Sequence, residues 1–183
     1  GGGGIEAGSK VQGRGTGGGS RLALRRGKEM GANVIATSSS EEKLERLKQR
    51  GADKVIDYRT TPEWRNAVKD ITQGRGVDHV VEVGGPGTLS QSINATRVGG
   101  RIALIGVLTG AAGPVPTAAL MMRHPKLNGI IVGHRQQQID LVSAINATSI
   151  RPVIDRSFPL EHIADAFRLQ QSGNHFGKIV LKF

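Results

Sequence analysis

Short apolar runs alternate with longer amphipathic segments along most of this chain, and this alternation limits the fold more than any other feature. The apolar runs predict six strands, at 11–14, 33–37, 54–57, 78–83, 101–105 and 129–132. The intervening segments predict helices at 17–30, 39–50, 62–72, 86–97 and 136–148, with a loop and short helix at 114–123. Strands joined by helices of this length pair in parallel and are buried on both faces. The sequence therefore predicts an α/β fold with a doubly wound parallel sheet.

The two ends of the chain fall outside this alternation. Residues 1–9 begin with four glycines and predict a flexible start, and residues 10–148 carry the alternating pattern. After that, 151–158 is predicted to be extended, 160–171 helical and 178–183 a final strand. We therefore predict a main domain over 10–148 and a separate C-terminal segment over 149–183.

A glycine-rich loop separates the first predicted strand from the first helix, and its residues are Gly15, Thr16, Gly17, Gly18, Gly19 and Ser20. Such a loop lets backbone N–H groups approach a pyrophosphate, whose charge is favoured at the helix N-terminus. The third motif position, Ser20, needs only a small residue because the helix packs closely on the strand there. The run 17–20 alone also resembles a flexible linker. Because strand–helix units follow it, we expect a Rossmann-type domain that binds a dinucleotide.

The second strand ends in serines, where an acidic residue would indicate recognition of a ribose 2′-hydroxyl. Neutral or basic groups suit a 2′-phosphate instead. Ser38 and Ser39 are candidate phosphate contacts, although serines here also suit helix capping, for which Ser39 and Glu42 have the right spacing.

Lys43 is the third candidate phosphate contact. A cation in the first helical turn opposes the helix dipole, so a nearby anion would account for it. The alternative is a surface lysine among neighbouring glutamates. We predict NADP(H) in preference to NAD(H), a preference that Glu41 would reverse if it reached a ribose hydroxyl.

The net charge of +10 raises nucleic acid as a partner. Aromatic residues make up only 3% of the chain, which leaves little for base stacking, and basic residues are scattered among acidic ones. We therefore expect no nucleic-acid partner. The absence of cysteine excludes disulfides and thiolate sites. No apolar run approaches the roughly 18 residues of a membrane helix, and no leader is visible, so we expect a cytoplasmic protein without a membrane partner.

Four stretches carry a family resemblance: VIATSSSEEKLERLKQRGADKVIDYRTTPEW, GRGVDHVVEVGGPGTLSQS, VGGRIALIGVLTG and HFGKIVL. They resemble the medium-chain dehydrogenase/reductase superfamily, specifically its zinc-type alcohol dehydrogenase-like and quinone oxidoreductase-like members. The resemblance implies hydride transfer between NAD(P)H and a small-molecule carbonyl, alcohol or activated alkene. It also implies a GroES-like catalytic domain that carries any zinc ligands and is missing here. Residues 149–183 would belong to that domain, and we expect no zinc in this chain.

Further site candidates follow predicted strands. In an open parallel sheet, ligands lie at the carboxyl ends of the strands. The loops after strands four and five are expected to face the ribose and nicotinamide, and the loop after strand six the carboxamide; the candidates are Gly84, Gly85, Gly106, Val107, Gly133 and His134. Tyr58 resembles a family position beside the adenosine end. Such glycines also serve simply to end strands.

No catalytic acid, base or nucleophile stands out, and the five histidines show no metal-ligand spacing. The groups that polarise a substrate would come from the missing domain, so we nominate no catalytic residue and expect this chain alone to be weak or inactive. The alternative is a non-catalytic dinucleotide-binding or assembly module, such as a homodimer joined at the sheet edge or strand six. In the first predicted strand and helix, Gln12 and the run 25–27 are less apolar than the resemblance implies. Gly27 alone costs the helix about 1 kcal/mol relative to Ala.

Overall fold

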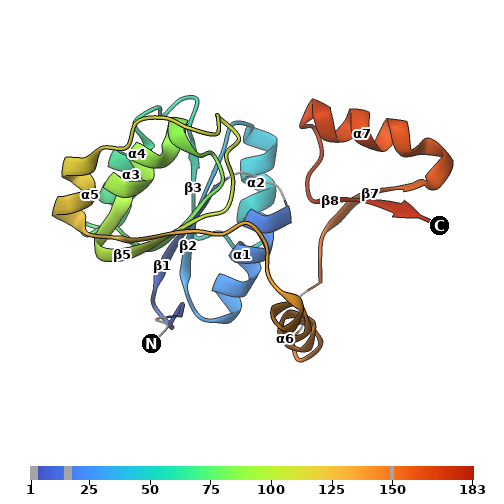
Figure 1. Ribbon diagram of the computed structural model, residues 1–183, viewed down its shortest axis with the longest axis horizontal. Helices are drawn as coiled ribbons and strands as arrows, with labels where there is room; N and C mark the ends of the chain where they lie inside the picture. Colours follow the sequence, from blue (N-terminus) through green and yellow to red (C-terminus); the bar gives the residue numbers. More distant parts are fainter. Residues whose placement is uncertain (1–3, 15–17, 149–150) are drawn as a thin grey trace.

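The computed structural model describes residues 4–14, 18–148 and 151–183 of the chain (Figure 1). Six parallel strands form the main sheet: β1 (Lys10–Arg14), β2 (Asn33–Ser38), β3 (Lys54–Asp57), β4 (Val77–Glu82), β5 (Thr96–Leu104) and β6 (Lys126–Gly129). Their order is β3-β2-β1-β4-β5-β6. This order reverses direction between β1 and β4, which is the doubly wound Rossmann arrangement and confirms the predicted fold class.

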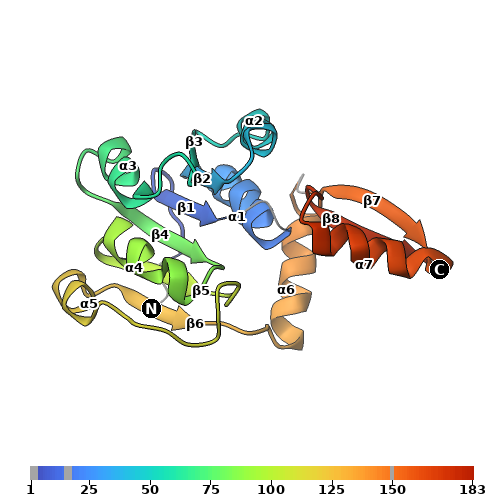
Figure 2. The ribbon, with the colours of Figure 1, turned by 90° about the horizontal axis from the view of Figure 1, so that it is seen from above.

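Helices cover both faces of the sheet (Figure 2). On one face, α1 (Gly18–Glu29) and α2 (Glu41–Gln49) contact the strands β1, β2 and β3. On the other face lie α3 (Trp64–Ile71), α4 (Pro86–Ala95) and α5 (Thr117–Arg123), of which α4 contacts β4 and β5. Right-handed crossovers in opposite directions from β1 produce this division.

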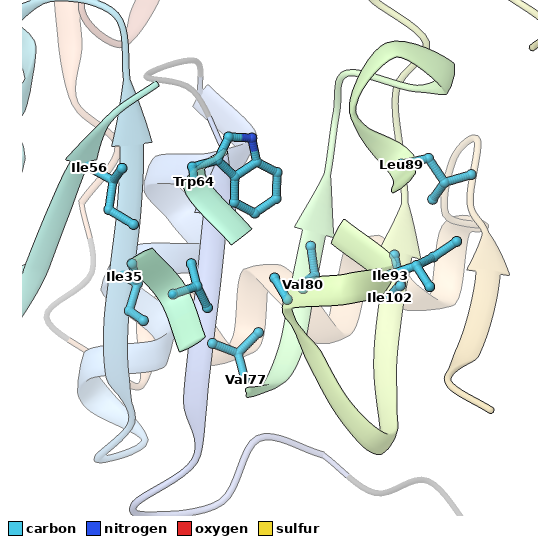
Figure 3. Close-up of a cluster of buried hydrophobic side chains, with 10 residues drawn as sticks. Ile35, Ile56, Trp64, Val77, Val80, Leu89, Ile93 and Ile102 are labelled. Carbon is cyan, nitrogen blue, oxygen red and sulfur yellow. The ribbon is translucent and has the colours of Figure 1, made fainter. Parts of the chain in front are cut away.

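Each face has its own apolar core. Figure 3 shows the core beneath α3 and α4, where Trp64 and Ile93 pack over strand residues that include Ile35, Val80 and Ile102. The other core joins Leu24 of α1 and the α2 leucines to Val11 and Val34. Fully burying one such aliphatic side chain contributes roughly 1.5–3 kcal/mol, so the two cores hold the helices to the sheet.

The C-terminal segment forms a second, smaller sheet. It follows α6 (Arg135–Asn146) and consists of β7 (Ile154–Pro159), the short helix η1 (Leu160–His162), α7 (Ile163–Ser172) and β8 (Lys178–Lys182). The strands β7 and β8 pair in parallel, beside α2 and apart from the main sheet (Figure 1). Phe176 anchors this segment, since it is fully buried in the α1–α2 core with the Arg46 guanidinium carbon 3.9 Å from its ring centroid.

Several predicted boundaries are wrong, among them the following three. The sixth strand covers 126–129 and not 129–132, because Lys126 to Gly129 pair with Arg101 to Leu104 of β5, while the apolar run 130–132 leaves the sheet and is exposed. The fourth helix ends at Ala95, and Thr96 already belongs to β5. The second helix begins at Glu41 with Ser40 as its N-cap, so Ser39 does not cap it.

Two described residues of the first strand and helix, Gln12 and Gly27, differ in what they contribute to the packing there. Both amide atoms of Gln12 in β1 are buried without a hydrogen-bond partner in the part of the chain that the structure describes. An unsatisfied buried polar group costs about 1–3 kcal/mol, so the Gln12 side chain lowers the stability of β1. Gly27 is different: an added Cβ would lie 3.1 Å from Val34 Cγ2, so glycine lets α1 approach β2 closely. Across the described ranges, no helix is long and apolar enough to cross a membrane.

Candidate functional site

The carboxyl ends of the strands bring most of the predicted site residues to one edge of the sheet. Ser38 is the last residue of β2 and is buried, and its carbonyl accepts a hydrogen bond from the Tyr58 N–H at 3.1 Å. Ser38 and Tyr58, two of the residues proposed for the adenosine end, lie 20 positions apart in the sequence and are in direct contact. The parallel register of β2 and β3, with Ser38 opposite Asp57, produces this contact.

Lys43 lies in the first turn of α2 and contacts the C-terminal segment. Its backbone N–H donates to the Ser40 hydroxyl at 3.5 Å, and its side-chain Nζ donates to the Gly173 carbonyl at 2.5 Å. Gly173 ends α7 with φ near 68°, which turns that carbonyl toward α2. The lysine ammonium has three donor hydrogens, so, among the described contacts, the bond to Gly173 leaves two for another acceptor.

The loops after β4 and β5 touch through their backbones. Gly85 has φ of 82°, and an added Cβ would lie 2.9 Å from the Val107 Cα. An added Cβ at Gly106 would lie 2.5 Å from the Val83 carbonyl oxygen. Contacts this short leave no space for a side chain, so these two glycines do more than end their strands: they allow the loops to pack together.

A cavity of about 410 Å³ lies beside this junction. Its walls come from the segments after β3, β4 and β5 and from α3 and α4, and they include Tyr58, Gly84, Thr88, Leu108 and Thr109. Ligands of a doubly wound sheet lie at this edge, and the cavity has an aromatic ring and a glycine backbone in its wall.

The remaining predicted site residues are not all brought to this junction. Gly15, Thr16 and Gly17 lie outside the described residues, whereas Gly18, Gly19 and Ser20 begin α1. His134 is the N-cap of α6: its Nδ1 accepts from the Gln137 N–H, and the Gln137 side chain accepts from the His134 N–H. Among the described contacts, those of Gly133 and His134 are with α6 and not with the two loops.

Sequence reasoning missed four polar residues that organise the junction. Glu82, fully buried at the end of β4, accepts hydrogen bonds from the Gly84 N–H at 2.6 Å, from the Thr88 hydroxyl at 2.7 Å and from the Ser92 hydroxyl. The Thr109 hydroxyl, from the loop after β5, bonds to the Gly84 carbonyl and the Gly87 N–H of the other connection. The one available signal was an acid inside the apolar run of the fourth strand; nothing in the sequence marks Thr109.

A metal site is absent from the described part of the chain, where no three His, Asp or Glu residues gather in a way that could hold an ion.

Comparisons with known proteins agree with this geometry. Residues 21–147 match the family model for zinc-binding dehydrogenases. A zinc-type alcohol dehydrogenase-like protein of Schizosaccharomyces pombe is 40% identical over 183 residues, which cover 97% of this chain and 53% of that protein. The chain therefore spans about half the length of this relative.

Solved structures share the fold. The crystal structure of an NAD-dependent alcohol dehydrogenase is 33% identical, with a TM-score of 0.88, over 98% of this chain and 52% of that one. A crotonyl-CoA carboxylase/reductase in complex with NADP is 25% identical, with a TM-score of 0.86, over 97% of this chain and 50% of that one. The neighbours thus use either cofactor. On these grounds the chain belongs to the zinc-binding dehydrogenase family of the medium-chain dehydrogenase/reductase superfamily.

Proposed function

We propose that this chain binds NADP(H) in preference to NAD(H), as the cofactor-binding portion of an oxidoreductase. The complete enzyme would transfer hydride between the nicotinamide cofactor and an alcohol, carbonyl or quinone-like substrate. In the same proposal, residues 10–148 form the dinucleotide-binding domain and residues 149–183 belong structurally to a catalytic domain. Family membership supports this assignment.

The observation that carries the proposal is the close backbone contact between the loops after β4 and β5, which glycines make possible. This contact lies at the carboxyl ends of adjacent strands and beside the 410 Å³ cavity. This edge of a doubly wound sheet is where dinucleotides bind. Glycines there let the backbone approach a ligand closely.

Each group of residues has a proposed task. Gly15 to Ser20 would receive the pyrophosphate, while Ser38, Ser39, Lys43 and Tyr58 would hold the adenosine end. Gly84, Gly85, Gly106 and Val107 would align the ribose and nicotinamide, with Gly133 and His134 near the carboxamide. The bound cofactor supplies or accepts the hydride, and the protein supplies orientation and electrostatics.

Lys43 provides the test of cofactor preference. Its two remaining ammonium donors suit a phosphate, and a hydrogen bond to a charged group is worth about 1.5–3 kcal/mol. In calorimetric titrations of the 183-residue chain we expect micromolar binding of NADPH and weaker binding of NADH. The Lys43→Ala change should weaken NADPH binding about tenfold and leave NADH binding nearly unchanged.

Lys48→Ala is the matched control, because Lys48 lies on the same helix but pairs with Glu45 at 3.4 Å in an exposed position. It should change neither affinity. Equal loss of both cofactors in Lys43→Ala would refute the phosphate role of this residue, and failure of the unaltered chain to bind either cofactor would refute the proposed function itself.

The second candidate, a non-catalytic assembly module, is favoured by a specific observation. The edge strand β6 pairs only with β5 among the described strands, and the adjoining Ile131 is 96% exposed. An exposed edge strand next to apolar residues invites pairing with another chain. A dimer in sedimentation velocity, together with no cofactor binding, would favour this candidate over the first.

A further inference from the structure

The segment after β5 is tied to the β4–α4 loop by main-chain hydrogen bonds. Ile105 N–H donates to the Glu82 carbonyl at 2.8 Å, and Thr109 N–H donates to the Gly84 carbonyl at 2.8 Å. Between these bonds the segment carries apolar side chains that remain in solvent: Val107 is 55% exposed and Leu108 is 83% exposed. Since burial contributes little there, the position of the segment depends on its polar contacts.

The Thr109 side chain adds a bridge between two groups of the other loop. Its hydroxyl donates to the Gly84 carbonyl at 2.7 Å and accepts from the Gly87 N–H at 2.8 Å. The hydroxyl thus uses its donor and one acceptor site together, which fixes its direction. Gly87 lies in the first turn of α4, so the bridge connects the β5–α5 segment to both the loop and the helix that follows it.

The β4–α4 loop is held independently on its buried side. The Glu82 carboxyl group accepts from the Gly84 N–H and from the hydroxyls of Thr88 and Ser92, the latter two on α4. Both Glu82 and Ser92 are fully buried. Glu82 therefore fixes the β4–α4 loop from inside, and Thr109 fixes the exposed β5–α5 segment against it.

We propose that Thr109 is a positioning residue for the cofactor site: its hydroxyl holds the Gly106–Val107 backbone against Gly85, in the arrangement that receives the nicotinamide half of the cofactor. This inference rests on the proposed function. Thr109 acts through the backbone of its segment. Its loss should therefore affect the nicotinamide half more than the adenosine half, which is assigned to Ser38, Lys43 and Tyr58.

Two ligands and three variants test the inference in the 183-residue chain. Thr109→Val keeps the shape and removes the hydroxyl; we expect it to weaken NADPH binding about tenfold, while adenosine 2′,5′-bisphosphate, which lacks the nicotinamide half, binds within about twofold of the unaltered chain. Thr109→Ser restores the hydroxyl and should restore NADPH binding. Thr117→Val, at an exposed threonine that begins α5, is the matched control and should change neither affinity.

The outcomes separate this inference from the function on which it rests. If the unaltered chain fails to bind NADPH, the proposed function falls and the inference falls with it. If it binds NADPH and Thr109→Val binds equally well, the inference alone is wrong. Equal weakening of both ligands in Thr109→Val would assign Thr109 a general structural role and would also overturn the inference. Hydrogen exchange adds a ligand-free check, since the Leu108 and Thr109 amides should exchange faster in Thr109→Val.

Discussion

Strand β4 carries a buried acid near each end, and the two acids have different partners. Asp78, at the amino end, pairs with Arg75 at 2.7 Å and Arg97 at 2.6 Å and accepts from the Lys10 N–H at 2.9 Å. The hydrogen bonds to Glu82, at the carboxyl end, include those from one backbone N–H and two hydroxyls of the following loop and helix. Asp78 joins β4 to β5 through an ion pair and to β1 through a backbone hydrogen bond, whereas Glu82 binds groups of the connection that follows β4.

This difference follows from the direction of the sheet. Ligands of an open parallel sheet lie at the carboxyl ends of the strands, so the amino end can be closed by ion pairs without obstructing a site. At the carboxyl end, Glu82 accepts hydrogen bonds from uncharged donors of the β4–α4 loop and of α4, and their geometry determines where that loop lies. We therefore assign Asp78 to stability and Glu82 to the shape of the candidate site.

The largest effect on stability is expected from Asp78→Asn. The change leaves two guanidinium groups without their shared counter-charge at a residue only 7% exposed, and it should lower the free energy of unfolding by about 2–3 kcal/mol. Urea denaturation measures this loss. Asp70→Asn, at an exposed position in α3, should cost less than about 0.5 kcal/mol. NADPH affinity should not change. A loss of NADPH affinity alongside the loss of stability would contradict the assignment of Asp78 to stability alone.

The contribution of Asp78 should also depend on pH in a defined direction. Burial on its own raises the pKa of Asp78, but hydrogen bonds from Arg75, Lys10 N–H and Arg97 outweigh it and hold the pKa well below its ordinary value. A carboxyl group with a lowered pKa in the folded state adds stability above its unfolded pKa, and this stability is lost as the pH falls through the folded value.

The advantage of the unaltered chain over Asp78→Asn should therefore be constant above about pH 5 and shrink below about pH 4. Denaturation curves at a series of pH values test this expectation. An advantage that grew on acidification would contradict the pairing.

The layered fold could be predicted because its signal is repeated. Each buried parallel strand is a short apolar run, and each helix has an apolar stripe, so errors at single boundaries do not alter the order of elements. The exception was β6, whose edge position lets polar Lys126 and Asn128 occupy the strand while the more apolar residues 130–132 lie outside it. Apolar content alone identifies a central strand better than an edge strand.

The candidate site was only partly predictable. Glycines at strand ends are visible in the sequence, and so is the serine that replaces an acid after the second strand. The hydroxyl bridge of Thr109 was not, because it joins residues 22 and 25 positions apart through backbone atoms that every residue carries. The contact of Lys43 with Gly173 spans 130 positions and was equally invisible.

A smaller effect is expected from Glu82→Gln, which tests the comparison directly because it is the same chemical change as Asp78→Asn. Glutamine keeps one acceptor oxygen for the Gly84 N–H and the Thr88 hydroxyl, and its amide can donate to the Ser92 hydroxyl, which is able to accept. We expect a loss of about 1 kcal/mol in the free energy of unfolding, less than half of the loss at Asp78. Glu45→Gln, an exposed control on α2, should cost still less. A loss at Glu82 equal to that at Asp78 would mean that charge, and not hydrogen-bond geometry, holds the carboxyl end, and the assignment of the two acids to different roles would fail.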